Sequence, residues 1–573
     1  MIKKTLFNEF LVDVLFGRFC LLILLFKLSF ATVYAQKELV KQPNIIFILT
    51  DDHRYDLLGC TGNKFIQTPH LDKLATDGIL FTNAHVTSAI CTPSRASIFL
   101  SQFERKHGVN FNSGTSVAES AWNDSYPVVL RKNGYYTGYI GKNHVPIGVG
   151  GYKSGVMEAS FDYWYAGHGH LSFYPKNRHK IFKGAVNDTQ VEVLEEGATD
   201  FLSNEYKLAG AKHFLSGLPE DKPFCMSINF NLPHGASTST MKMLSTDLDT
   251  YKSLYRDKEI PLPKYYTEKN AIISPKLPAN LLHANDRQDI YDFVDNKQDL
   301  RERMIRNMQA VTGIDALVGN LRQTLKDRNL DKNTIIIFTS DHGIFWGENG
   351  LGGKALCYEV CTRVPMIVYD PTASKNNRGI KSNELVQTID LAPTMLSYAS
   401  IPLPASYQGK PLNTIIHGND APVRDVLFTE NLWSTHFGNP RCEAVQNKEW
   451  KYIRYYKNSN LSAQYLIETA KKYKVNMKSM LYANHDPQIA LYQSYIEGPL
   501  NKEPAVYEEL YHLKNDPDEQ NNLAKSRANT EKLEEMRQVW NNTLREARGN
   551  EALNVVRYTM DSEAERASSI KPE

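Results

Sequence analysis

The chain has 573 residues, of which 42% are hydrophobic and 23% charged, and its formal net charge is +2. This balance excludes a disordered, collagen-like or disulfide-scaffold protein, and the length allows about two to four domains. Because the basic residues form no long run or stripe, the sequence predicts no binding of nucleic acid.

Residues 1–35 have the pattern of a signal peptide. Basic side chains precede an apolar stretch over 19–26, and the segment ends in the fairly small residues of 33–35. Lys27 interrupts the apolar part, so no charge-free run reaches the ~18 to 20 residues of a membrane-spanning helix. We therefore expect cleavage after residue 35, export to the periplasm or the exterior, and no membrane span.

Apolar runs separated by helical patterns follow the leader. In the clearest helical pattern, at 299–326, apolar residues recur every three or four positions. Alternating buried strands and helices predict an α/β fold with a mostly parallel sheet between helices, whose ligands bind beyond the carboxyl ends of the strands. The predicted buried strands are 44–50, 224–230, 334–339 and 364–369.

The pattern changes after about residue 415. Short, half-exposed strands at 426–429 and 450–456 and a polar helix at 531–546 follow, without another long apolar strand. We therefore predict a large α/β domain over 36–415 and a smaller carboxyl-terminal subdomain with an antiparallel sheet over 416–573.

The seven cysteines are too scattered for a disulfide framework. Cys357 and Cys361 are four positions apart, as on one helix face, but without a second pair ordinary packing is favoured over a zinc site. The tract 167–170 contains two histidines, but its aromatic neighbours favour a folded loop over a metal site. Those aromatics are expected to pack in the core, with a sugar-binding surface as the alternative.

Carboxylates follow two of the predicted buried strands. Asp51 and Asp52 follow the first, and Asp341 with His342 follows another. An isolated pair of this kind is usually a solvated turn, but its recurrence favours a divalent metal site. Hard oxygen ligands suit Ca²⁺ or Mg²⁺, and the carboxylate count favours Ca²⁺. Because imidazole is a softer ligand than Ca²⁺ usually takes, the identity of the ion stays open.

The most informative segment is Cys91-Thr92-Pro93-Ser94-Arg95. A single cysteine is most often a small buried hydrophobe, but this segment resembles the Cys-x-Pro-x-Arg signature of the type I sulfatase family. Further blocks resemble that family, in its order, over roughly residues 43 to 525. They are Asp51-Asp52, Gly141-Lys142-Asn143-His144, Pro233-His234, Ser340-Asp341-His342-Gly343, Gly347-Glu348, Gly350-Leu351-Gly352-Gly353-Lys354, Arg363-Val364-Pro365, Glu509-Leu510-Tyr511-His512-Leu513, Asp516-Pro517 and Asn522-Leu523.

The resemblance implies an alkaline-phosphatase-like fold and hydrolysis of a sulfate ester. Cys91 would be converted to Cα-formylglycine (3-oxoalanine) by a formylglycine-generating or anaerobic maturating enzyme. One hydroxyl of the hydrated aldehyde would attack sulfur, and the other would expel sulfate by reforming the aldehyde. One divalent cation per chain, Ca²⁺ by expectation, would be bound by Asp51, Asp52, Cys91, Asp341 and His342.

The resemblance also implies roles for five further side chains. Arg95 and Lys142 would hold the diol and its developing charge, and His144 would be the base for elimination. His234 would protonate the departing alcohol, while Lys354 would bind sulfate and the bridging oxygen. Lone lysines and histidines are most often surface residues, so these roles depend on the family blocks that contain them.

The substrate implied by the resemblance is a sulfated carbohydrate, such as ulvan, carrageenan or a glycosaminoglycan oligosaccharide. His436 and Arg441 lie where the carboxyl-terminal subdomain of the family reaches the active site. We hypothesise that Arg441 binds an acidic sugar, because arginine pairs with carboxylate or sulfate through two hydrogen bonds.

Two alternatives stay open. A phosphatase or phosphonate hydrolase of the same superfamily usually has Thr or Ser as its nucleophile and favours transition metals, whereas this chain has Cys91 in a complete signature. A catalytically silent carbohydrate-binding protein is the other alternative, and the intact set of site residues argues against it.

Overall fold

The computed structural model of the protein describes residues 42–109, 115–168, 210–234, 252–268, 276–278, 281, 292–419, 421–432, 440–457, 496–549 and 555–557. The predicted signal peptide and His436 therefore lie outside the described residues. Among the helices of these segments, none combines the length and the apolar character that a bilayer span requires.

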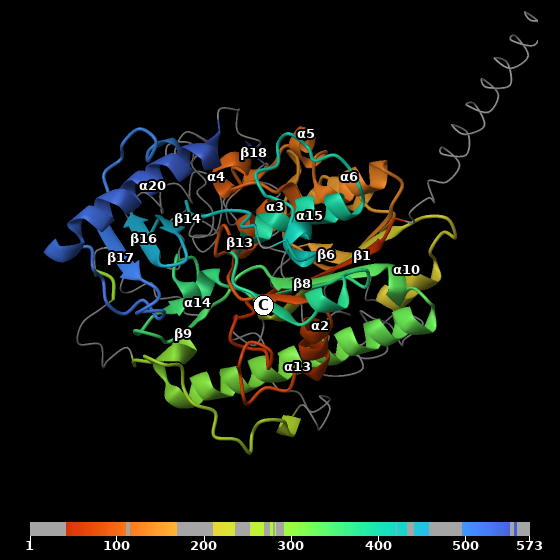
Figure 1. Ribbon diagram of the computed structural model, residues 1–573, viewed down its shortest axis with the longest axis horizontal. Coiled ribbons are helices and arrows are strands. Elements are labelled where there is room, and N and C mark those ends of the chain that lie inside the picture. Colours follow the sequence, from red (N-terminus) through yellow and green to blue (C-terminus); the bar gives the residue numbers. More distant parts are fainter. Residues whose placement is uncertain are drawn as a thin grey trace, which may run out of the picture. The chain divides into compact units, whose positions relative to one another are not determined.

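An eight-stranded, mostly parallel sheet lies among the helices (Figure 1), in the order β12-β2-β11-β8-β1-β7-β5-β6. This architecture confirms the predicted fold class. The predicted strand at 364–369 is β11, which runs antiparallel to both of its neighbours. The strands are β1 (Asn44–Asp51), β2 (Ile79–Phe81), β5 (Tyr136–Asn143), β6 (Tyr163–His168), β7 (Phe224–Pro233), β8 (Thr334–Ser340), β11 (Met366–Tyr369) and β12 (Ile380–Ser382).

Strand β1 is buried on both faces, as its unbroken apolar sequence predicts. Ile46 and Ile48 pack in one hydrophobic cluster, whereas Ile45 and Phe47 pack in another, because successive side chains of a strand point to opposite faces. The first cluster includes side chains of α2 (Pro69–Asp77), α10 (Ala211–Ser216) and α13 (Lys297–Asp327). The second includes side chains of α3 (Cys91–Leu100), α6 (Tyr126–Lys132) and α15 (Leu391–Tyr398).

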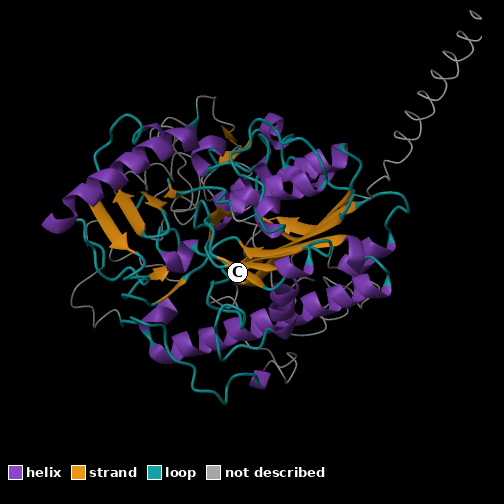
Figure 2. Cartoon of the chain, viewed as in Figure 1, coloured by secondary structure: helices purple, strands orange, loops and turns teal. Residues whose placement is uncertain are grey.

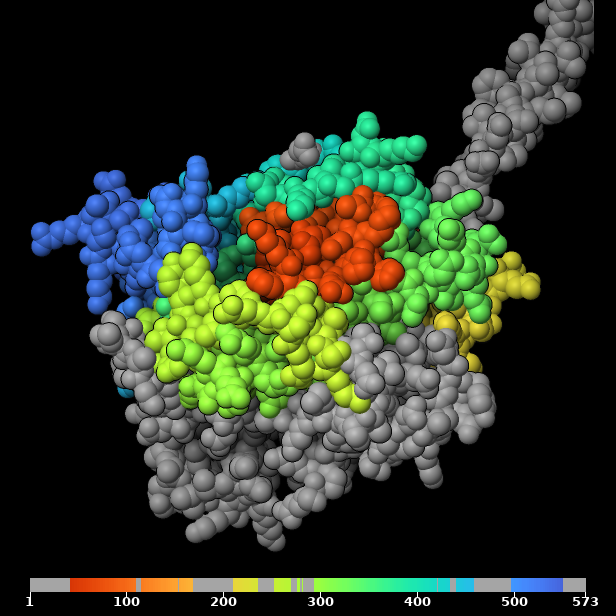
Figure 3. Space-filling view, turned by 90° about the horizontal axis from the view of Figure 1, so that it is seen from below, coloured from red at the N-terminus to blue at the C-terminus, as the bar shows by residue number. Residues whose placement is uncertain are grey.

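The long helix predicted at 299–326 is α13, which begins directly after its capping residue, Asn296. The Asn296 side chain accepts hydrogen bonds from the backbone N–H groups of Gln298 and Asp299 at 2.8 and 3.2 Å. The apolar stripe of α13 packs against α2 and the sheet. In the space-filling view, the orange-red segment that contains α2 lies beside the green segment that contains α13 (Figure 3).

A second, antiparallel sheet lies at the left of the view in Figure 2. Its strand order is β14-β15-β16-β17, which confirms the predicted carboxyl-terminal architecture. Helix α20 packs on it through a cluster that includes Phe428, Met536 and Trp540. The elements are β14 (Leu427–Asn431), β15 (Cys442–Gln446), β16 (Trp450–Tyr455), β17 (Tyr507–His512) and α20 (Thr530–Arg548).

Shorter elements complete the described fold. Strand pairs β13–β3, β10–β9 and β18–β4 form three small sheets. Their bounds and those of the short helices are β3 (Ala84–His85), β4 (Thr115–Val117), β9 (Phe345–Trp346), β10 (Gly352–Gly353), β13 (Val386–Gln387), β18 (Val555–Arg557), α4 (Glu104–His107), α5 (Glu119–Trp122), α7 (Val156–Ala159), α14 (Glu359–Thr362) and α16 (Asn413–Ile416).

Arg105 of α4 joins the region after α3 to the antiparallel sheet. Its side chain is fully buried and bonds to Glu430 on β14 through Nε at 3.0 Å, while its backbone N–H donates to the same carboxylate at 2.8 Å. The guanidinium also contacts Glu443 on β15. One arginine therefore lies between two buried carboxylates.

Candidate active site

Four adjacent strands of the large sheet bring most of the predicted site residues together. β8, β1, β7 and β5 are neighbours in that order, and parallel strands end at the same edge of a sheet. Asp51 is the last residue of β1, and Asp341 follows the last residue of β8. The residues at or just beyond these strand ends are Asp51, Asp52, Lys142, His144, His234, Asp341 and His342.

Cys91 comes to this edge from helix α3, of which it is the first residue. Pro93 fits the first turn because backbone N–H groups there have no partner within the helix. The Ser94 hydroxyl donates to the backbone carbonyl of Asp341 at 2.6 Å, and Arg95 Nε donates to the Asp341 carboxylate at 2.8 Å. The signature therefore attaches the start of the helix to the end of β8.

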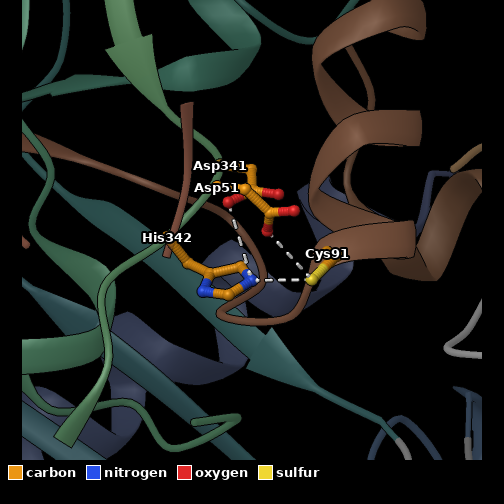
Figure 4. Close-up of side chains that lie close together, drawn as sticks. All are labelled: Asp51, Cys91, Asp341 and His342. Carbon is orange, nitrogen blue, oxygen red and sulfur yellow. Dashed lines mark hydrogen bonds and ion pairs between the residues drawn. The ribbon is translucent and has the colours of Figure 1, made fainter. Parts of the chain in front are cut away.

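Three predicted metal-binding side chains converge on the Cys91 thiol (Figure 4). Cys91 Sγ lies 3.5 Å from Asp51 Oδ1 and 3.2 Å from His342 Nε2. One atom from each of Asp51, Cys91, Asp341 and His342 lies within 4.8 Å of the others. These four buried side chains can therefore contact a single ion.

Asp52 faces the second ring nitrogen of His342, whose first ring nitrogen faces Cys91. Its Oδ1 accepts a hydrogen bond from Lys354 Nζ at 2.8 Å and lies 3.3 Å from His342 Nδ1. Its Oδ2 accepts no hydrogen bond among the described residues and lies 3.7 Å from His234 Nε2. This buried oxygen is available for a cation.

The carboxylates interact strongly because they share a site without solvent. Burial alone would raise the pKa of Asp51, but the positive charge of Lys142, whose ammonium contacts it, holds that pKa well below its usual range. Burial and the neighbouring charge of Asp51 raise the pKa of Asp341. A bound cation would remove this repulsion, so the residues present fit a hard divalent ion such as Ca²⁺.

The unmodified thiol of Cys91 is a poor nucleophile in this position. Burial and the adjacent Asp51 carboxylate raise its pKa, although Lys354 Nζ lies 3.2 Å from the sulfur. The thiol is therefore protonated at neutral pH, and the thiolate is the reactive form of cysteine.

The two predicted acid–base histidines differ in exposure. His234 retains 13% of its side-chain exposure, and burial together with the charge of Lys354 lowers its pKa well below the usual value. His144 is completely buried, with its ring 6.4 Å from that of Tyr152 in a stacked arrangement. His234 is thus the histidine that a bound substrate can reach from solvent.

Arg441 has its described contacts with residues next to strands of the antiparallel sheet. Its Nη2 donates to the Glu503 carboxylate at 2.6 Å and to the backbone carbonyl of Lys457 at 3.1 Å, and the guanidinium lies over the Tyr456 ring. The side chain is buried. A sugar carboxylate would have to compete with Glu503 for this group.

Ser340 is a site residue to which the sequence assigned no role. Its Oγ accepts a hydrogen bond from the His53 backbone N–H and donates to the His342 carbonyl, both at 3.0 Å. It therefore fastens the turn after Asp52 to the turn after β8. Its position in the block Ser340-Asp341-His342-Gly343 is the sequence feature that could have identified it. The sequence does not show which hydrogen bonds its hydroxyl makes.

The structure also describes part of the aromatic segment and the two cysteines for which the sequence favours ordinary packing. Tyr165 is buried and Trp164 stacks on Tyr139 with ring centroids 5.2 Å apart, which is core packing. The tract 167–170 extends beyond the described residues. Cys357 and Cys361 are both buried, and neither belongs to the groups of possible metal ligands found among the described residues.

Comparison with known families gives two matches. The family model described as Sulfatase matches residues 43–401, and the model described as N-sulphoglucosamine sulphohydrolase, C-terminal, matches residues 347–490. Among curated proteins, the chain is 26% identical over 479 residues to the N-acetylglucosamine-6-O-sulfatase of Bacteroides thetaiotaomicron, covering 74% of this chain and 80% of that protein.

Solved structures share the fold. A structure in complex with its substrate D-glucosamine-2-N,6-O-disulfate superposes with a TM-score of 0.62 at 22% identity, covering 89% of this chain and 99% of that one. A phosphonate monoester hydrolase from Silicibacter pomeroyi also has a TM-score of 0.62, at 18% identity, covering 88% and 96%. The fold alone therefore does not separate sulfate from phosphonate chemistry.

Proposed function

The chain belongs to the sulfatase family and is a sulfuric ester hydrolase, and from that premise we propose that it removes sulfate from a sugar through an aldehyde made from Cys91. The observation that supports this most directly is the convergence of Asp51, His342 and Lys354 on the Cys91 sulfur. A carboxylate, an imidazole and an ammonium around one atom suit a group that must be held, polarised and relieved of negative charge.

We propose Ca²⁺ as the ion, held by Asp51, Asp52, residue 91, Asp341 and His342. Three carboxylates supply the hard oxygen ligands that Ca²⁺ prefers, and Asp52 Oδ2 accepts no hydrogen bond among the described residues. The ion would act as a Lewis acid at the sulfate oxygens and at the hydrated aldehyde.

Arg95 and Lys142 are proposed to orient residue 91 and to offset negative charge near it. Arg95 forms an ion pair with Asp341, and Lys142 forms one with Asp51. Each pair holds a positive charge close to residue 91. Positive groups that are already in place stabilise developing charge without reorganisation.

His234 is proposed to protonate the departing sugar oxygen, and Lys354 to bind the sulfate and the bridging oxygen. Lys354 Nζ lies 2.8 Å from Asp52 Oδ1 and 3.2 Å from Cys91 Sγ. Burial and the charge of Lys354 lower the pKa of His234, and the negative charge of a bound sulfate would oppose that shift and favour the protonated form that an acid needs. His144 is proposed to take the proton whose loss allows sulfate to leave residue 91. An aldehyde at this position would let sulfate depart as the carbonyl reforms.

The proposed substrate is a sulfated sugar within a glycosaminoglycan or algal polysaccharide fragment. The curated relative acts on N-acetylglucosamine 6-sulfate by its name, and the solved structure contains a disulfated glucosamine. Contact of Arg441 with an acidic sugar is part of this proposal. Arg441→Ala should then lower kcat/KM only for oligosaccharides that carry a carboxylate, and unchanged activity on all of them would end that part of it.

We also propose that residues 1–35 are a leader for export, that 36–415 form the catalytic domain and 416–573 the smaller subdomain, and that a separate maturation enzyme oxidises Cys91. A sulfated polysaccharide is an extracellular substrate, which agrees with the leader pattern in the sequence.

Parallel assays with an aryl sulfate and an aryl phosphate test the reaction against the phosphonate-hydrolase alternative. We expect a preference for sulfate, and a preference for phosphate would overturn the proposal. Mass spectrometry of the peptide containing Cys91 is the companion measurement, because the aldehyde is about 18 Da lighter than cysteine. An unmodified thiol in protein from the native host, without turnover, would instead support a silent carbohydrate-binding protein.

A further inference from the structure

The thiols of Cys357 and Cys442 are in contact with each other. Among the described residues, neither belongs to the groups of possible metal ligands around Cys91. Their sulfur atoms lie 3.5 Å apart, and both side chains are almost completely buried. Cys357 Sγ also lies 3.8 Å from the carbonyl oxygen of Thr429. The surrounding cluster is apolar and includes Leu356 and Ala444.

The two cysteines belong to different parts of the fold. Cys357 lies three residues after Lys354, in the segment that leads into α14, whereas Cys442 is the first residue of β15. They are 85 positions apart in the sequence. A bond between them would fasten the segment that carries Lys354 to the antiparallel sheet.

We propose that Cys357 and Cys442 form a disulfide bond when the chain folds in an oxidising compartment. Disulfides persist outside the cytoplasm, so the premise is the proposed export of the chain and not its proposed reaction. Sulfur atoms already in van der Waals contact need to approach by only about 1.5 Å to reach the bonded distance.

The bond forms by exchange with a thiol oxidase that carries a disulfide. One cysteine thiolate attacks that disulfide, giving a mixed disulfide and releasing one thiolate of the oxidase. The second cysteine thiolate attacks the chain's sulfur in the mixed disulfide and releases the other. The two cysteines together lose two protons and two electrons, and the oxidase becomes a dithiol.

The exchange must precede closure of the apolar cluster. Burial is the main cause that raises the pKa of the Cys442 thiol in the folded chain, and the hydrogen bond with Cys357 raises it further. Because the thiolate is the attacking species, the Cys442 thiol reacts more readily before it is buried.

Peptide mapping tests the bond directly. Trypsin releases residues 355–363, with Cys357 and Cys361, and residues 442–448, with Cys442. The chain is purified from the periplasm after export on a leader that the host recognises, and it is alkylated without reductant while it is unfolded. We expect a linked pair lighter by two hydrogen atoms than the same two peptides with free thiols at Cys357 and Cys442. Fragmentation should locate the bond at Cys357. Free thiols at both positions, or a bond from Cys361, would overturn the proposal.

Thermal unfolding with and without dithiothreitol gives a second readout. Reductant should lower the unfolding temperature of the exported protein by roughly 2 to 5 °C. Cys361→Ala is the matched control, because Cys361 is buried in the same cluster, and it should keep this sensitivity to reductant. Cys442→Ala should lose it, and equal sensitivity in all three proteins would contradict the bond. Sulfate hydrolysis enters neither measurement, so failure here and failure of the proposed reaction are separable.

Discussion

Arg95 and Asp341 form a fully buried ion pair that joins helix α3 to the carboxyl end of β8. Arg95 Nε donates to Asp341 Oδ2 at 2.8 Å, and the same guanidinium lies 3.7 Å from Asp51 Oδ2. One planar cation thus holds the helix that begins with Cys91 against two proposed metal ligands.

Arg95→Lys should keep the charge but lower kcat by roughly 10²- to 10³-fold, because an ammonium cannot reproduce the fixed fork of the guanidinium. The kinetic measurement is turnover of an aryl sulfate, normalised to the fraction of residue 91 found as aldehyde by mass spectrometry. That normalisation separates poor maturation from poor chemistry. A variant with full aldehyde content and wild-type kcat would show that the pair is only structural.

Cys91→Ala should fold like the wild type and lose turnover by roughly 10⁴-fold or more, because it removes the group that accepts sulfate. Cys225→Ala is a matched control, since Cys225 is also buried but is the second residue of β7, at the end of the strand opposite to the site. Circular dichroism checks the fold, and an aryl sulfate assay checks turnover. Appreciable sulfatase activity in Cys91→Ala, beyond contamination by host enzymes, would refute the proposed nucleophile.

Removal of divalent cations should abolish turnover, and added Ca²⁺ should restore it. The physical reason is that Asp51, Asp52 and Asp341 place three carboxylates in one solvent-free site. Calorimetry should show one Ca²⁺ bound per chain, with affinity lowered at least about tenfold by Asp341→Asn. Full activity in protein shown by elemental analysis to contain no metal would exclude the proposed cation.

Glu430 should make the free energy of unfolding fall between about pH 4.5 and 7. Burial raises the pKa of Glu430 from 4.5 to about 7, although Arg105 opposes the shift. The unfolded chain loses this proton first, so stability decreases as the pH rises through this window and then levels off. The Glu430→Gln side chain can still accept a hydrogen bond from Arg105 but cannot titrate. In urea unfolding, this variant should lose roughly 1 to 3 kcal/mol less unfolding free energy than the wild type across this pH window.

Glu508→Gln gives the control of opposite sign for this measurement. Burial acts to raise the pKa of Glu508, but hydrogen bonds from Arg537 and Tyr452 lower it below its usual value. Its contribution is therefore present above the unfolded pKa and lost as the pH falls. If Glu430→Gln and wild type changed in parallel between pH 4.5 and 7, the shifted titration of Glu430 would be wrong.

Long apolar strands and contiguous motifs are the features that could be predicted. β1 and β8 contain unbroken apolar runs and β7 is mostly apolar, and the residues at their ends follow from the topology of a parallel sheet. The neighbouring strand β5 escaped prediction because close packing requires glycine there. A Cβ at Gly138 would lie 2.5 Å from the Phe214 ring, and one at Gly141 would lie 2.1 Å from the Asn229 carbonyl oxygen.

Contacts between distant segments could not be predicted. Arg105 and Glu430 are 325 positions apart, and no local pattern pairs them. The same holds for Cys357 and Cys442, which have no shared motif. For these pairs the packing of α4 and of the segment before α14 against the antiparallel sheet, rather than the sequence around each residue, decides which side chains meet.

His234 and His144 should respond differently to the leaving group. If His234 protonates the departing oxygen, His234→Ala should slow a sugar sulfate by roughly 10²- to 10⁴-fold, because an alkoxide leaves poorly without a proton. An aryl sulfate, whose phenolate leaves unaided, should lose less than about tenfold.

His144→Ala is the matched control, since the proposed base acts after the alcohol or phenol has left. Its deficit should appear in single-turnover experiments as fast release of the phenol followed by slow release of sulfate, with either substrate. The exposures agree with this assignment, because the His234 side chain keeps 13% of its exposure whereas His144 is completely buried. Equal losses on sugar and aryl sulfates in His234→Ala would show that this histidine is not the acid.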